Sequence, residues 1–165
     1  MTYRFLDSPV GGLLLARDEA GLRSIHFQHG RHPQQPAPAW RRDDASFDDV
    51  VPQLEEYFAG TRRAFNLPLA PEGTAFQQRV WSAVLDIPYG QTISYGELAA
   101  RIGQRSASRA VGLANGSNPL PIVIPCHRVI GSNGKLTGYG GGVAIKERLL
   151  TLERGVRNLF DGLRI

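Results

Sequence analysis

Residues 118–129 read Asn-Pro-Leu-Pro-Ile-Val-Ile-Pro-Cys-His-Arg-Val, and they contain the single cysteine of the 165-residue chain. Three prolines precede Cys126, and each proline fixes its own φ angle and restricts the residue before it. The segment is therefore expected to be rigid and extended, with a short buried strand over residues 122–124. A cysteine and a histidine directly after such a strand indicate a reactive group at the floor of a pocket.

Two interpretations of Cys126 have to be compared. A lone cysteine is more often an inert buried side chain than a nucleophile. Two features favour the nucleophile here: the adjacent His127 could lower the pKa of the thiol or accept its proton, and the prolines fix the position of the sulfur. Because neighbouring side chains usually point apart, we expect His127 to act through a bridging water.

The composition is that of an ordinary globular protein, with 42% hydrophobic and 21% charged residues. No apolar run is long enough to span a membrane and no signal peptide is recognisable, so we expect a cytoplasmic protein without membrane association. A single cysteine excludes an internal disulfide and fits a reducing compartment.

His26, His29 and His32 recur at every third residue, but this is not zinc-ligand spacing, and no metal site is predicted. No nucleotide-binding or paired-cysteine motif is present, so no cofactor is predicted.

Charge is distributed unevenly between the two halves of the chain. Residues 1–73 contain 8 arginines and 10 acidic residues, whereas residues 74–165 contain 11 basic and 5 acidic residues. A basic half is compatible with a polyanionic partner such as DNA, although many protein surfaces are modestly basic.

The first 70 residues have the pattern of a β-rich domain. Strand-forming residues alternate with turn residues, and a Pro/Gln/Arg-rich stretch interrupts them. The predicted elements are strands at 3–6, 12–16 and 22–27, an exposed loop at 29–42, a helix at 46–59 and a strand at 65–69. Ser46 is expected to cap the helix and Gly60 to end it.

After a linker rich in proline and glycine, residues 74–165 have the pattern of helices. Thr74 and Gln77 match a capping box, as do Ser94 and Glu97. The predicted helices run from 74 to Pro88, from 94 to 102, from 106 or 107 to 115, and from 143 to 154. The two short helices on either side of Gly103 are typical of a helix-turn-helix, a motif that binds DNA in some proteins and only packs in many others.

The motif Pro-Cys-His-Arg-Val at 125–129, preceded by Asn118-Pro119 and followed by Tyr-Gly-Gly-Gly at 139–142, closely resembles the O6-alkylguanine-DNA alkyltransferases, also called methylated-DNA–protein-cysteine methyltransferases. The resemblance is dense over 74–153 and looser before it. It implies an α/β fold with a ribonuclease-H-like β-sheet domain at 1–70 and a mainly helical domain at 74–165.

The activity that the resemblance implies is DNA repair by direct alkyl transfer. An alkyl group, such as methyl, would move irreversibly from O6 of guanine in duplex DNA to Cys126, once per molecule and without a cofactor. His127 would be the base that takes the thiol proton, Glu153 would orient and stabilise His127, and Arg128 would give local salt bridging or charge support. The substrate-binding residues would be Tyr95, Asn118, Val129, Tyr139 and Gly140. Several relatives have serine at the position of Gly140, so a hydrogen bond from there would have to come from backbone here.

The resemblance also places a DNA-reading helix in the minor groove. A base within a duplex cannot present its O6 substituent to a pocket, so it must be flipped out. Arg109 would fill the gap in the base stack, and small residues would let the helix approach the groove. The implied DNA-binding residues are Arg109, Ala110, Gly112, Ala114 and Asn115.

Three other functions are weighed against this one. A non-catalytic sensor of alkylation damage would have another residue at Cys126. A helix-turn-helix regulator in this family would carry a further N-terminal module with cysteine ligands. A Cys–His hydrolase would leave the DNA-reading helix unexplained. We expect a monomer, and the sequence leaves open cooperativity on DNA, the preferred alkyl group, activity on O4-alkylthymine and the role of the first domain.

Overall fold

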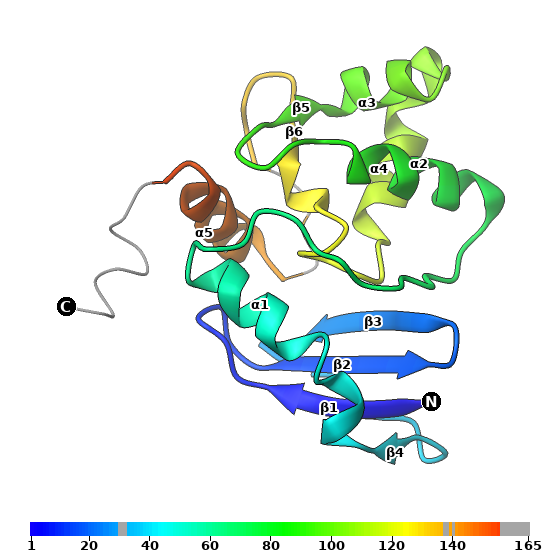
Figure 1. Ribbon diagram of the computed structural model, residues 1–165. Coiled ribbons are helices and arrows are strands. Elements are labelled where there is room, and N and C mark those ends of the chain that lie inside the picture. Colours follow the sequence, from blue (N-terminus) through cyan, green and yellow to red (C-terminus); the bar gives the residue numbers. More distant parts are fainter. Residues whose placement is uncertain (30–32, 137–138, 140, 156–165) are drawn as a thin grey trace.

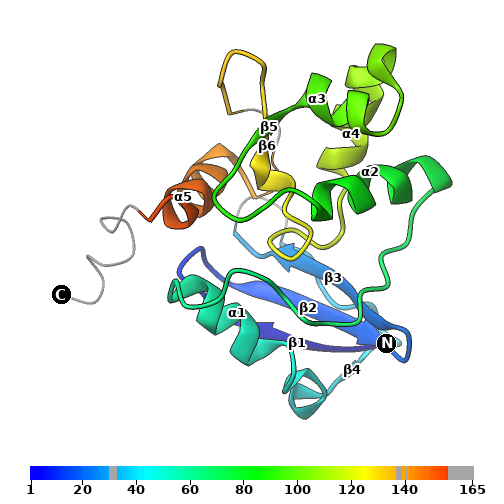
Figure 2. The same cartoon turned by 45° about the horizontal axis from the view of Figure 1, so that its top comes forward.

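The computed structural model of the protein describes residues 1–29, 33–136, 139 and 141–155 of the chain. A sheet domain carrying one helix across its face lies below a group of helices, and the segment that joins α1 to α2 runs between them (Figures 1 and 2). Among the described residues, no helix is both long and apolar enough to cross a membrane.

The N-terminal sheet confirms the predicted meander. Its strands are β1 (Thr2–Leu6), β2 (Leu13–Asp18), β3 (Gly21–Phe27) and β4 (Arg41–Arg42), in the order β3-β2-β1-β4. The first three pair antiparallel, and β4 joins the edge of β1 in parallel. Residues 13–16 of β2 are all buried, and Leu13 and Leu15, on the same face of the strand, belong to the main hydrophobic core cluster.

Three details of this domain differ from the prediction. The short strand β4 lies inside the segment predicted to be a loop, where the backbone of β1 offers it an edge. Ser46 lies in a 3-10 helix, η1 (Asp44–Phe47), and helix α1 spans Val51–Phe58 without a side-chain cap. The predicted strand at 65–69 is wrong: only Leu69 forms an isolated bridge, to Leu22.

The helices of the second domain begin where the sequence predicted. Helix α2 (Ala75–Leu85) has the full capping box of Thr74 and Gln77. Helix α3 (Tyr95–Arg101) is capped by the Ser94 hydroxyl, which accepts from the Glu97 N–H. A 3-10 turn, η2 (Arg105–Ala107), leads into α4 (Ser108–Gly116), and α3 packs on α4 as in a helix-turn-helix. Helix α5 spans Val143–Glu153.

The segment before the cysteine is not the strand that the sequence predicted. Residues 121–124 form a buried turn in which the Ile124 N–H donates to Leu120 O at 2.8 Å. Ile122 has φ of +76°, a strained conformation for a β-branched residue. The turn delivers the chain into the 3-10 helix η3 (Cys126–Arg128), after which β6 (Val129–Ile130) pairs in parallel with β5 (Ile93–Ser94).

The two domains meet at this segment. The Ile25 N–H of β3 donates to Pro119 O at 2.9 Å, so the sheet edge holds the backbone that leads to Cys126. Helix α1 lies between the sheet and the helices above it, close to α5 (Figure 1). The cysteine therefore lies between the sheet domain and the helix-turn-helix.

Candidate active site

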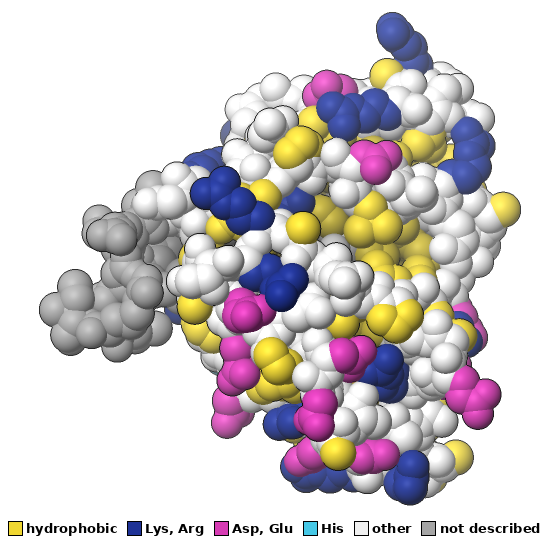
Figure 3. Space-filling model, in the orientation of Figure 1, with side chains coloured by type: hydrophobic (Ala, Val, Ile, Leu, Met, Phe, Trp, Pro, Cys, Tyr) yellow, Lys and Arg dark blue, Asp and Glu magenta, His cyan; other side chains and the backbone are white. Residues whose placement is uncertain are grey.

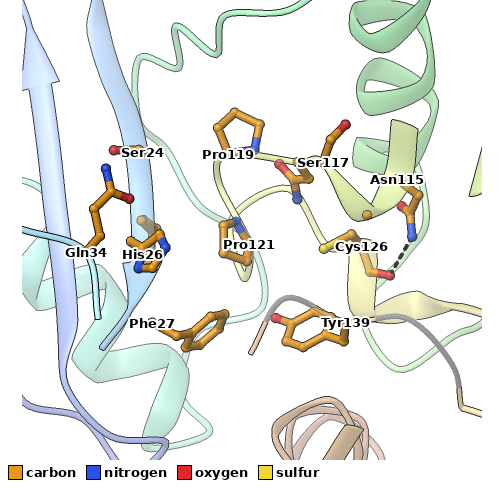
Figure 4. A pocket seen from close by; sticks show the side chains of 13 residues that line it. Ser24, His26, Phe27, Gln34, Asn115, Ser117, Pro119, Pro121, Cys126 and Tyr139 are labelled. Atoms are coloured by element: carbon orange, nitrogen blue, oxygen red, sulfur yellow. Dashed lines mark hydrogen bonds between the residues drawn. The ribbon is translucent and has the colours of Figure 1, made fainter. Parts of the chain in front are cut away.

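Cys126 opens the 3-10 helix η3 and faces a cavity of about 330 Å³ between the two domains. Figure 4 shows its sulfur directed toward Pro121, with Tyr139 below it and the side chains of β3 across the cavity. The wall on the sheet side comes from Ser24, Ile25, His26, Phe27 and Gln34. A substrate in this cavity would contact both domains.

The thiol is held in a poorly solvated position. Burial raises the pKa of Cys126 to about 11, although a hydrogen bond with the Asn118 side chain and the nearby positive charge of Lys146 lower it in part. The resting cysteine is therefore a thiol, and it needs a base to become a nucleophile. Asn118 also fixes the chain around the sulfur, because its amide donates to Ile124 O at 2.8 Å and accepts from the Leu120 N–H at 2.9 Å.

His127 is completely buried, and its two ring nitrogens have different surroundings. Nε2 lies 2.6 Å from Glu153 Oε2, whereas the buried Nδ1 has no hydrogen-bond partner among the described residues. Burial lowers the pKa of His127, and Glu153 opposes this shift. The arrangement favours a neutral ring with its proton on Nε2 and an acceptor at Nδ1.

Glu153, at the end of α5, is the most heavily hydrogen-bonded side chain of the site. Arg128 Nε donates to Oε1 at 2.7 Å and Arg128 Nη2 to Oε2 at 3.1 Å, in addition to the bond with His127. Burial would raise the pKa of Glu153, but the bonds and charges of His127 and Arg128 outweigh it and lower the pKa to about 2. The carboxylate is thus ionised at any pH at which the protein works.

Lys146 contributes to this site and was not predicted from the sequence. Lys146 is fully buried, donates from Nζ to Val129 O at 2.7 Å and lies 5.9 Å from the centre of the Tyr95 ring. Arg128, for which local salt bridging or charge support was expected, forms a two-pronged ion pair with Glu153. The signal for Lys146 was weak, because a lysine within a helix usually marks the exposed face.

The predicted substrate-binding residues fall into two groups. Asn118 and Tyr139 line the cavity with Cys126, and the buried Tyr139 hydroxyl has no partner among the described residues. Val129 is fully buried behind the cysteine, and Tyr95 packs against α4 at Gly112. Gly140 lies outside the described residues.

The predicted DNA-binding residues also divide. Arg109 and Ala110 are exposed on α4 and Gly112 is half-buried. Ala114 and Asn115 point inward, and the Asn115 amide donates to Cys126 O at 3.2 Å. Asn115 thereby supports the cysteine segment and also lines the cavity in front of Cys126. Leu113, which the sequence analysis passed over, is 73% exposed on the same helix.

A buried thiol, histidine and carboxylate beside a helix-turn-helix are the combination expected of a DNA-binding protein that accepts an alkyl group on its own cysteine. Family models agree with this class over both domains. Residues 75–155 match the DNA binding domain of 6-O-methylguanine DNA methyltransferase, and residues 1–71 match its ribonuclease-like domain. The chain therefore belongs to the 6-O-methylguanine DNA methyltransferase family.

Individual relatives are similar over nearly the full chain. A methylated-DNA–protein-cysteine methyltransferase of Methanosarcina acetivorans is 52% identical over 93% of this chain and 98% of its own, and one of Mycobacterium tuberculosis is 51% identical over 92% of each. The crystal structure of Mycobacterium tuberculosis OGT in complex with DNA superimposes with a TM-score of 0.87 at 50% identity, covering 94% of each chain. The predicted family, two-domain fold, DNA-binding character and methyltransferase activity in DNA repair are confirmed.

Proposed function

We propose that Cys126 is the alkyl acceptor and that it works once per molecule. The sulfur attacks the alkyl carbon on guanine O6, so that an S–C bond forms while the C–O6 bond breaks and guanine leaves with the electron pair. The observation that carries this assignment is the position of the thiol, which faces the interdomain cavity directly beside the buried His127–Glu153 pair. A thioether is stable, and no second cysteine is present to release the alkyl group.

In this proposal His127 is the base and Glu153 its orienting partner. The thiol proton passes to Nδ1 of His127, which faces away from Glu153, and the charged ring that results is stabilised by the carboxylate at Nε2. No hydrogen bond joins the ring to the thiol in the described part of the chain, so the proton crosses through a water. Tyr95 and Tyr139 are proposed as donors to the departing guanine, and Asn118, Val129 and Gly140 as parts of the pocket.

Helix α4 is proposed to enter the minor groove of duplex DNA. Arg109 occupies the place of the flipped base, and Ala110 and Gly112 allow close approach. The face shown in Figure 3 supports DNA binding through the C-terminal domain, because acidic side chains gather over the lower, N-terminal domain, whereas basic side chains predominate above. We add Leu113 to this surface, since an exposed leucine next to an arginine can wedge against base edges. Ala114 and Asn115, on the buried side of α4, are proposed to position this helix on the DNA.

The remaining parts of the proposal follow from the family and the sequence. The domains extend over 1–70 and 74–165, and the protein acts as a monomer without a cofactor. A cytoplasmic location is supported by the lone thiol, which must stay reduced to react.

The deciding experiment is peptide mass spectrometry after incubation with duplex DNA that contains one O6-methylguanine. We expect one methyl group on the Cys126 peptide, saturating at one per protein molecule. Cys126→Ser should bind the same DNA and gain no mass. Tight binding by the native protein without any mass change would instead identify a damage sensor.

The role of Arg109 has its own test. If this side chain supports base flipping, Arg109→Ala should react normally with a free O6-alkylguanine base but about 10–100-fold more slowly with the same lesion in duplex DNA. Arg105→Ala is a matched control, since Arg105 is also exposed nearby, in η2. Equal losses on both substrates would refute the proposed role.

A further inference from the structure

Tyr57 connects the N-terminal domain to the carboxylate of the active site. It lies on α1, is completely buried, and donates from its hydroxyl to Glu153 Oε2 at 2.6 Å. The two residues are 96 positions apart in the sequence. The ring is held edge-on or tilted against Phe58, Phe65 and Tyr89, with centroid distances of 5.4, 5.6 and 6.3 Å. Its hydroxyl therefore has a fixed position.

The oxygen that Tyr57 contacts is the one that faces the histidine. Glu153 Oε2 also accepts from His127 Nε2 at 2.6 Å and, at the longer distance of 3.1 Å, from Arg128 Nη2, whereas Oε1 accepts from Arg128 Nε. Tyr57 and His127 thus share a single carboxylate oxygen. A donor at this oxygen draws negative charge away from the imidazole and fixes the direction in which the carboxylate faces it.

Packing alone does not account for a tyrosine at this position. Phenylalanine would fill the same space among the aromatic rings without a buried hydroxyl that needs an acceptor. Burial and the negative charge of Glu153 raise the pKa of Tyr57 well above its ordinary value, so the hydroxyl remains a donor throughout the working range.

We propose that Tyr57 is a positioning residue through which the N-terminal domain holds Glu153 and sets how strongly Glu153 stabilises protonated His127. This inference rests on the proposed function, in which His127 accepts the thiol proton. It gives the sheet domain a part in the reaction beyond forming one wall of the cavity.

The charged and titratable groups around His127 determine the direction of the expected effect. Arg128 of η3 and Lys146 of α5 oppose a positive charge on the ring, whereas Glu153 favours it. Cys126, Tyr57, Tyr89 and Tyr139 are uncharged in the resting site, and burial raises the pKa of each. Removing the Tyr57 hydroxyl leaves more negative charge on Oε2 for His127. The ring then binds a proton more readily.

The test compares Tyr57→Phe with the native protein and with Tyr89→Phe. Tyr89 is a suitable control because its ring packs against Tyr57 and Arg128, while among the described residues the hydrogen bonds to Glu153 come from Tyr57, His127, Arg128 and the Gly90 backbone. The rate of alkyl transfer from a free O6-alkylguanine base is measured across pH, which avoids any effect on DNA binding. We expect the acidic limb of the profile to move to higher pH by about 0.5–1 unit in Tyr57→Phe alone.

A second measurement does not depend on activity. With ¹⁵N-labelled histidine, the His127 ring should titrate at higher pH in Tyr57→Phe than in the native protein and in Tyr89→Phe. Thermal unfolding is followed in parallel, since a purely structural role would lower the Tm and leave both titrations in place. That result, or equal shifts in both variants, would overturn the proposal. If the native protein transferred no alkyl group, the proposed function itself would be overturned. The histidine titration would still show whether Tyr57 affects the pKa of His127, so the two failures can be told apart.

Discussion

Cys126 precedes His127 in the chain and Glu153 is hydrogen-bonded to the His127 ring, and the fold shifts the pKa values of Cys126 and Glu153 in opposite directions. The thiol has one side-chain hydrogen bond, to Asn118, and burial raises its pKa to about 11. The carboxylate accepts hydrogen bonds from His127, Arg128 and Tyr57, and its pKa falls to about 2. The Cys126 thiol is thus kept protonated, whereas the Glu153 carboxylate stays ionised.

Under the proposed function, this contrast explains how Cys126 can remain unreactive until its substrate binds. A permanently ionised cysteine would react with any small electrophile that reached the cavity. In the proposed mechanism, a protonated cysteine beside a neutral histidine stays unreactive until a substrate is in place, and the fixed carboxylate stabilises the histidine when it takes the proton. The reactivity of Cys126 then depends on His127 and Glu153 as well as on the thiol itself.

The largest effect is expected from breaking the carboxylate side. Glu153→Gln leaves the buried Arg128 without its ion pair, so the free energy of unfolding should fall by about 3–5 kcal/mol. The alkyl-transfer rate of the folded fraction should fall on the order of 100-fold, because His127 loses its stabilising charge. Chemical denaturation and single-turnover kinetics measure the two effects.

Glu147→Gln is the matched control for this substitution. Glu147 lies on the same helix, α5, but is exposed. If both variants behaved alike, the loss would reflect α5 and not the ion pair.

The second effect is the acid sensitivity of the native protein. The folded pKa of Glu153, about 2, lies below its ordinary value of 4.5, so this group stabilises the fold above about pH 4.5 and ceases to do so as the pH falls toward 2. The loss amounts to about 3 kcal/mol at full protonation. Urea unfolding at a series of pH values should show it, and the same series on Glu153→Gln should have a shallower slope. Parallel slopes for the two proteins would contradict the lowered pKa.

Local signals in the sequence were sufficient for much of the fold. The capping box of Thr74 and Gln77 and the turns between the first three strands depend on residues that are close in the chain, and each was found where predicted. The segment 122–124 was mistaken for a strand because a short apolar run also fits a buried turn. Its positive φ at Ile122 is rare for a β-branched residue, so no local pattern predicts it.

The candidate site was predictable where a family motif carried it and not where distant residues met. Cys126 and His127 were found together because they are neighbours, and Glu153 through the resemblance. Tyr57 and Lys146 had no such signal, since each reaches the site only through the packing of a helix against another domain or strand. Buried hydrogen bonds between residues far apart in the sequence are decided by tertiary structure.

The third prediction concerns the sulfur side. Asn118→Ala removes the hydrogen bond that lowers the pKa of Cys126, so the thiol pKa should rise and alkyl transfer should slow by about 10-fold. The pH dependence of iodoacetamide labelling measures the thiol directly. Asn133→Ala, in an exposed turn, serves as the control. Because Asn118 also holds the turn before the cysteine, a loss of Tm without any change in thiol pKa would assign it a structural role only.

The smallest effect should come from Lys146→Met, which keeps an unbranched side chain one atom shorter than lysine and removes its charge. That charge lowers the pKa of Cys126, so labelling by iodoacetamide should slow about 2–5-fold, less than in Asn118→Ala. The chain offers a matched control, since Lys135, the other lysine, is exposed, and Lys135→Met should label at the native rate. A buried charge is screened poorly by salt, so the difference between the two variants should persist at high ionic strength. If added salt abolished it, the effect on the thiol would come from the general surface charge of the domain and not from Lys146 within the site.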